Sequence, residues 1–299
     1  MVDPAYAASP VADPWLDLVQ AKKARARRRI GTVLAAALVT VLALVASQGT
    51  FNPDPNPGQT VAASLRQTLA AGSAAAQVSA DVQSGAQEFS LTGTGRMDFA
   101  HGTVSIDETV HLPTQDQSVS VTYVGGAIFE ALPDLDQVEP GKTWVALDFS
   151  VEADRSNLLF GGDNPAAMLA LLAQPGVKVS SLGSQTIDGS STDGYQVAIP
   201  QSAITHQLAS PQIPPWLNAA FAHINFTDIS ETLHIDQSNR IRQFGFQMTV
   251  AGASTSMSYS ETVDLSHFGL PVSISAPPAG ETVSYDKLLR DVQALSNPQ

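Results

Sequence analysis

Hydrophobic residues along the chain follow distinct patterns, each typical of a different structural element. Residues 30–46 form an apolar run that no charged residue interrupts. Further on, Val61, Leu65 and Leu69 recur at a spacing of four, which predicts a helix over 60–76. From there onward apolar residues alternate with polar ones, which predicts β-strands with one buried and one solvated face.

The alternating region predicts a strongly curved antiparallel sheet. Strands are expected within 89–99, 104–112, 119–123, 127–132, 177–187, 195–199, 226–236, 240–250 and 254–265. Gly125 and Gly126 indicate a hairpin turn between two of these strands. Gly93 and Gly95 lie inside a strand, where glycines permit strong curvature.

Helices are expected at four further places in the same region. Pro165 in the first turn and Pro175 after the end favour a helix over 163–174. Shorter helices are expected over 201–209 and 215–222, and a closing helix over 285–295. Together with the strands these helices predict an α+β fold.

The apolar run at the N-terminal side indicates a transmembrane helix over 30–47. It is near the lower length limit for crossing a bilayer. Arg27, Arg28 and Arg29 directly precede it, which places the N-terminus in the cytoplasm and the rest of the chain outside. The alternative is a signal peptide that is cleaved. The retained anchor is favoured, because the preceding tail is long for such a peptide.

The predicted domain organisation has four parts. Residues 1–29 form a basic cytoplasmic tail, expected to be disordered, and residues 30–47 form the span. Residues 48–59 are a proline-rich linker that holds the outer domain off the membrane. Residues 60–299 form one extracytoplasmic domain, because no proline-rich boundary divides them.

Charge and composition narrow the possible functions. The 299-residue chain has a formal net charge of −13, but residues 1–29 contain six basic residues and only three acidic ones. The outer part is therefore strongly acidic, which argues against nucleic acid as a partner. The chain contains no cysteine, which excludes disulfides, thiolate metal sites and a cysteine nucleophile.

No pattern of residues indicates catalysis or a cofactor. The six histidines are scattered without metal-ligand spacing, and no Gly-x-Ser-x-Gly motif occurs. Asp148, Glu152 and Asp154 lie close together, but they lack the spacing of a calcium-binding loop and are better read as solvated carboxylates. We therefore expect neither an enzyme nor a bound metal or cofactor.

Several short motifs, in their order and spacing, carry a family resemblance. They lie at 123–129, 141–148 (GKTWVALD), 187–197, 233–242 and 268–278. In this order they resemble the actinobacterial LppX/LprG-like lipoproteins over about residues 61–283. One departure concerns the anchor, because Ser47 stands where those lipoproteins carry a lipidated cysteine.

The resemblance implies a fold and a function. The fold is of the LolA/LolB type, a curved antiparallel half-barrel whose concave face is covered by helices. The function is binding of a lipid or lipoglycan-like hydrophobic ligand in the cell envelope, with transport or handover as an extension. The alternative is an envelope-sensing or protein-interaction module that signals through the cytoplasmic tail. An envelope protein would then be the partner.

Aromatic and methionine residues on the apolar strand faces are the candidate ligand-binding residues. They either pack as plain core or line a hydrophobic cavity, and the cavity follows from the resemblance alone. The candidates are Phe89, Met97, Phe99, Tyr123, Phe129, Trp144, Met168, Leu172, Phe244, Phe246 and Met248.

Overall fold

The computed structural model describes part of the chain. The described residues are 57–84, 87–112, 115–148, 176–200, 202, 225–251 and 256–296. The predicted tail and membrane span, and the helix expected over 163–174, lie outside them. The helices expected over 201–209 and 215–222 also lie outside them, apart from residue 202. Among the described residues no helix is long and apolar enough to cross a membrane.

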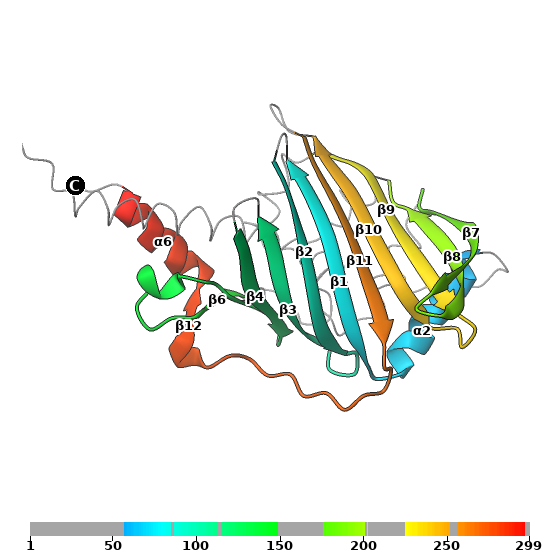
Figure 1. Cartoon of the computed structure of the whole chain (residues 1–299), viewed down its shortest axis with the longest axis horizontal. Helices are drawn as coiled ribbons and strands as arrows, with labels where there is room; N and C mark the ends of the chain where they lie inside the picture. Colours follow the sequence, from blue (N-terminus) through cyan, green and yellow to red (C-terminus); the bar gives the residue numbers. More distant parts are fainter. Residues whose placement is uncertain are drawn as a thin grey trace, which may run out of the picture.

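Twelve strands in the described residues form a single sheet (Figure 1). They are β1 (Ser73–Ser84), β2 (Gln87–Asp98), β3 (Thr103–Leu112), β4 (Gln115–Val124), β5 (Ala127–Ala131), β6 (Trp144–Asp148), β7 (Lys178–Ile187), β8 (Ser190–Ala198), β9 (Asn225–Asp236), β10 (Ile241–Ala251), β11 (Ser256–Ser266) and β12 (Thr282–Ser284). Their spatial order is β12-β6-β5-β4-β3-β2-β1-β11-β10-β9-β8-β7.

The sheet consists of two antiparallel meanders joined side by side. Strands β1 to β6 form one meander and β7 to β11 the other, and the antiparallel pairing of β1 with β11 joins them. The chain after β11 runs along one border of the sheet and returns to the far end, where β12 pairs in parallel with β6 (Figure 1). A large antiparallel sheet with few helices agrees with the α+β prediction, and it is consistent with a half-barrel.

Two α-helices in the described residues pack at opposite ends of the sheet. Helix α2 (Pro57–Ala70) contacts β7, β9 and β10, and helix α6 (Tyr285–Ser296) contacts β6 and β12 (Figure 1). Lys287 in α6 donates to the buried carboxylate of Glu139 over 2.6 Å, which ties this helix to the loop before β6. Two short 3-10 helices lie at Leu135–Gln137 and Ala279–Glu281.

Helix α2 differs from the prediction at both ends. It begins at Pro57, inside the predicted linker, because proline lacks the N–H that the first helical turn leaves unpaired. It ends at Ala70, and Gly72 then adopts a φ of 81°, which a glycine accommodates without strain. Strand β1 starts at Ser73, although an alanine-rich sequence there resembles a helix.

Hydrogen bonds from α2 fix its position over the β9–β10 hairpin. The backbone N–H of Ile241 donates to the Thr68 hydroxyl over 2.8 Å, and this pair is buried. The Ser64 hydroxyl lies 2.6 Å from the side-chain oxygen of Asn239, which adopts a left-handed φ of 58° in the hairpin turn. The helix therefore contributes both apolar and polar contacts at this end.

Candidate functional site

One face of the sheet, called here the inner face, carries most of the buried side chains. Residues directly opposite each other on paired strands project to the same face. One row across this face contains, in spatial order, Tyr195, Leu233, Phe244, Val263, Val78, Gly93, Glu108 and Val119. Its valines and leucine are at most 2% exposed, so this face belongs to the core.

Small residues occupy the middle of the inner face, on β1 and β2. Ala76 in β1 is paired with Gly95 in β2, Val78 with Gly93, and Ala80 with Leu91. A Cβ atom at Gly93 would stand 3.0 Å from Cγ of Glu108, so the glutamate side chain leans over this glycine toward β1. A Cβ atom at Gly95 would collide with the backbone of β3. These glycines therefore allow β3 and its side chains to approach closely.

Four glutamates share the inner face with the apolar residues. Glu108, Glu130, Glu231 and Glu261 are 3%, 1%, 5% and 3% exposed. Each occupies a strand position between two apolar residues of the same face. These flanking pairs are Ile106 and Val110, Ile128 and Leu132, Ile229 and Leu233, and Tyr259 and Val263.

The carboxyl oxygens of these glutamates are poorly satisfied. Both oxygens of Glu108 and one oxygen each of Glu130 and Glu261 have no hydrogen-bond partner in the described part of the chain. The other oxygen of Glu261 accepts from the Tyr259 hydroxyl over 3.0 Å. No ion pair links the four glutamates to a basic side chain among the described residues. Such buried acceptors are costly unless a partner reaches them.

Burial dominates the electrostatics of this cluster. Loss of hydration raises the pKa of Glu108 to about 7 and the pKa of Glu231 to about 8. Burial, reinforced by the charge of Glu108, raises the pKa of Glu130 to about 8. Burial also raises the pKa of Glu261 well above its ordinary value, and Glu108 adds to this while Tyr259 opposes it. Near neutral pH Glu130 and Glu231 are therefore mostly protonated, able to accept and to donate hydrogen bonds, whereas Glu108 is present in both its protonated and its charged form.

Glu108 is the electrostatic centre of the cluster, because its charge affects the pKa of both Glu130 and Glu261. The three groups come from β3, β5 and β11, which lie on both sides of the junction between the meanders. Helix α6 borders the cluster, since the charge of Glu130 also raises the pKa of Tyr285. We call Glu108, Glu130 and Glu261 the carboxyl cluster.

The structure places most of the predicted ligand-binding residues on the inner face. Those at inner-face positions are Phe89, Met97, Tyr123, Phe244, Phe246 and Met248. Phe99 follows the end of β2 and packs against the core while partly exposed. Met168 and Leu172 lie outside the described residues.

Two of the predicted residues, Phe129 and Trp144, lie on the opposite face. The Gly125–Gly126 turn pairs Tyr123 with Ile128, so even-numbered residues of β5 share the inner face with odd-numbered residues of β4. Phe129 therefore points outward, and the next pairing sends Trp144 outward as well. Successive side chains of a strand point to opposite faces of the sheet, so the aromatic character of a residue does not show which face it occupies.

The glutamates of the inner face were missed by the reading of the sequence. A usable signal existed, because each glutamate replaces an apolar residue in a strand that otherwise alternates regularly. Charged residues at such positions are rare in ordinary cores. The same signal does not reveal that three of the glutamates, from distant strands, lie near one another.

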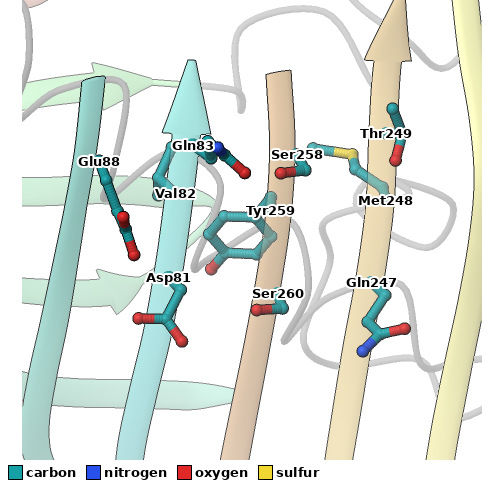
Figure 2. A pocket seen from close by; sticks show the side chains of 10 residues that line it. All are labelled: Asp81, Val82, Gln83, Glu88, Gln247, Met248, Thr249, Ser258, Tyr259 and Ser260. Carbon is teal, nitrogen blue, oxygen red and sulfur yellow. The ribbon is translucent and has the colours of Figure 1, made fainter. Parts of the chain in front are cut away.

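Two hollows with mainly polar linings open elsewhere on the described surface. One, of about 320 Å³, lies at one end of β1, β2, β10 and β11 (Figure 2). Its lining includes the outward-facing Asp81, Gln83 and Glu88 besides inner-face Met248 and Tyr259. The other, of about 500 Å³, lies between the outer face of β2–β4 and the segment 273–275. Neither has the apolar lining that the predicted ligand requires.

Metal-binding side chains do not gather in the described part of the chain. No group of three or more histidine and carboxylate residues there has the geometry to hold an ion. His101 bonds Asp98 over 2.8 Å, and His111 bonds Asp116 over 3.1 Å, each as a local pair. Glu152 and Asp154 of the weighed calcium site lie outside the described residues.

Comparison with known proteins finds solved structures to which this chain is similar in fold. No protein-family model matches the sequence, and no curated protein matches it either. The lipoprotein LppX of Mycobacterium tuberculosis is 16% identical, with 75% of this chain and 100% of that chain covered at a TM-score of 0.38. LprF of Mycobacterium bovis is 15% identical, with 77% of this chain and 100% of that chain covered at a TM-score of 0.39. A LolA superfamily protein of Nitrosomonas europaea is 10% identical, with 69% of this chain and 93% of that chain covered at a TM-score of 0.28.

Proposed function

We propose that this protein binds a hydrophobic or amphiphilic ligand against the inner face of its sheet. The observation that carries the proposal is the combination of an apolar face with buried carboxyl oxygens that lack partners among the described residues. Sites for small amphiphiles combine these two features, because an apolar lining holds the chain and a few polar groups orient the head.

The surroundings of the inner face favour binding over simple core packing. In its middle, on β1 and β2, alanine and glycine alternate with the larger Val78 and Leu91, and Phe246 and Met248 lie on β10, beyond β11. A solid core would place apolar side chains where Glu108 and Glu261 stand, since burying unpaired carboxyls weakens the fold. Retaining them at this cost is typical of a functional site.

The cellular setting that we propose is the cell envelope. The apolar span predicted over 30–47 would tether the domain to the membrane, with residues 60–299 outside. A tethered domain binds its ligand in place and exchanges it with a membrane or with a neighbouring protein. The motif resemblance to lipid-binding lipoproteins supports this setting.

Photo-crosslinking of the full-length chain in amphipol tests the proposal. The probe is a long-chain fatty alcohol with a diazirine in its alkyl chain, and adducts are located by peptide mass spectrometry. We expect adducts at inner-face residues such as Met97, Val121 and Met248, reduced by excess unlabelled alcohol. The probe carries no charge, so it reports on binding at the inner face without a contribution from ion pairing.

The outward-facing Phe129 and Trp144 are internal controls in the same experiment, because their side chains are also apolar but lie on the opposite face. They should remain unmodified. Adducts restricted to residues 30–47, or spread equally over both faces of the sheet, would contradict the proposed function.

A further inference from the structure

We propose that the ligand of the inner face carries a polar group that donates hydrogen bonds and has no negative charge, and that the carboxyl cluster accepts those bonds. Hydroxyl and ammonium groups share this chemistry. The inference rests on the proposed function and specifies which amphiphiles the site would accept.

The unpartnered atoms of the inner face are acceptors from two kinds of side chain. The cluster offers four carboxyl oxygens without partners in the described part of the chain. The side-chain oxygen of Gln117, which is 5% exposed, is a further one. Gln117 lies opposite Val110, two residues along β3 from Glu108, and its side chain is on the same face. An amide carries no charge, so the shortage of donors is not a property of the acidic residues alone.

The position of the Glu108 side chain opens the cluster toward the middle of the sheet. Its Cγ lies over Gly93, and the adjoining row contains Ala80, which stands between Glu261 and Leu91. Gly93 and Ala80 alternate here with the larger Val78 and Leu91, so only this diagonal pair of positions lacks a bulky side chain between the two carboxyls. A head group placed above Gly93 and Ala80 would therefore meet carboxyl oxygens from both meanders.

The lack of a basic side chain paired with the cluster disfavours a negatively charged head group. Apart from two histidines that pair locally with aspartates, the basic side chains of the described residues that form ion pairs are Arg240, Arg242 and Lys287. Their partners are Asp236, Glu139 and Asp291. None of these pairs involves the cluster. A phosphate or carboxylate head would place its charge beside Glu108, which is partly ionised near neutral pH, and none of these ion pairs supplies a compensating cation, which costs binding free energy. A donor would instead satisfy acceptor oxygens that are now unpaired.

A head-group panel tests the inference on the full-length protein in amphipol. A neutral fluorescent acyl probe is displaced by four amphiphiles with the same twelve-carbon chain. Their heads are maltoside, primary ammonium, trimethylammonium and phosphate, and all are used below their micellar concentrations. We expect maltoside and primary ammonium to bind about tenfold more tightly than phosphate, equivalent to about 1.4 kcal/mol. Trimethylammonium, which has no N–H donor, should bind more weakly than primary ammonium.

Substitutions in the carboxyl cluster test whether it causes the head-group preference. Glu108→Gln removes the central acid and adds an amide donor, so phosphate should approach the affinity of maltoside. Glu261→Gln provides a second test if Glu108→Gln fails to fold. Glu88→Gln is the matched control, because it makes the same change on an exposed outward-facing residue of β2 and should leave the preference unchanged.

The outcomes separate this inference from the proposed function. Phosphate binding as tightly as maltoside, with the acyl probe bound normally, would overturn the head-group inference and leave the proposed function intact. Equal binding of the two ammonium heads would overturn the hydrogen-bond component. Absence of acyl-probe binding would overturn the proposed function itself.

Discussion

Glu130 illustrates at the scale of one residue how this sheet differs from an ordinary core. It stands in β5 between Ile128 and Leu132, is 1% exposed, and has one carboxyl oxygen without a partner among the described residues. A buried carboxyl in such surroundings avoids the cost of charge by keeping its proton. The pKa of about 8 therefore keeps Glu130 mostly protonated near neutral pH, and folding becomes linked to pH.

Stability should fall as pH rises from about 4.5 to about 8, because the folded pKa of Glu130 is about 8 and its ordinary value is 4.5. Below both values the carboxyl is protonated in the folded and the unfolded state, so it favours neither. Between them the unfolded state releases a proton that the folded state keeps, and this release favours unfolding. Each pKa unit corresponds to about 1.4 kcal/mol, so the loss should reach a few kcal/mol.

Glu130→Gln should flatten this dependence, because an amide does not titrate. The measurement is denaturant unfolding of both proteins at several pH values between 5 and 8.5. Glu88→Gln, on the exposed face of β2, should retain the slope of the unchanged protein. If the free energy of unfolding of Glu130→Gln and of the unchanged protein had the same pH dependence, Glu130 would not be its source.

At the scale of elements, glycine in β2 leaves room for the backbone and side chains of β3. A Cβ atom at Gly95 would collide with the carbonyl oxygen of Ser105 and with Ile106 on the neighbouring strand. Gly245 also lies inside a strand, but a Cβ there would make ordinary contacts, 3.5 Å from the Glu261 carbonyl oxygen and 3.7 Å from Thr232. Two glycines within strands thus have different roles.

Gly95→Ala and Gly245→Ala form a matched pair that tests this difference. Gly95→Ala should destabilise the protein by about 1–3 kcal/mol, because the added methyl forces β3 away from β2. Gly245→Ala should be neutral or slightly stabilising, since alanine restricts the unfolded chain more than glycine does. Thermal unfolding of both variants provides the measurement. A Gly95→Ala variant as stable as Gly245→Ala would contradict the close packing.

At the scale of the whole molecule, charge is divided between the two ends of the predicted span. Residues 1–29 have a basic excess, and the remainder of the chain has an acidic one. The predicted orientation follows from the arginines before the span. The absence of cysteine makes this orientation directly measurable, because any introduced thiol is unique.

Single-cysteine variants labelled with a membrane-impermeant maleimide test the orientation. Leu182→Cys, at a position of β7 that is 52% exposed, should react in intact spheroplasts. Ala8→Cys in the predicted tail should react only after lysis. Val61→Cys, at a position of α2 that is 0% exposed, controls for burial and should react only after denaturation. Labelling of Ala8→Cys before lysis would contradict the orientation.

Local pattern predicted the elements well wherever the pattern was strong. Strands β9 and β10 and helix α6 lie within two residues of their predicted bounds, because regular alternation and helical spacing are properties of neighbouring residues. The prediction was wrong at the start of β1, where Ala74 and Ala76 have side chains too small to display a period of two. It was also wrong for the faces of Phe129 and Trp144, which depend on the pairing of strands.

The amino-acid sequence by itself determined the antiparallel strands, the apolar side of most of them, and the acidic excess outside the N-terminal segment. These follow from side-chain chemistry and spacing along the chain. Only the tertiary structure decided that β1 pairs with β11, and that this brings Glu261 near Glu108. A residue's pKa and its lack of partners depend on neighbours that are distant in sequence, and folding alone brings such neighbours together.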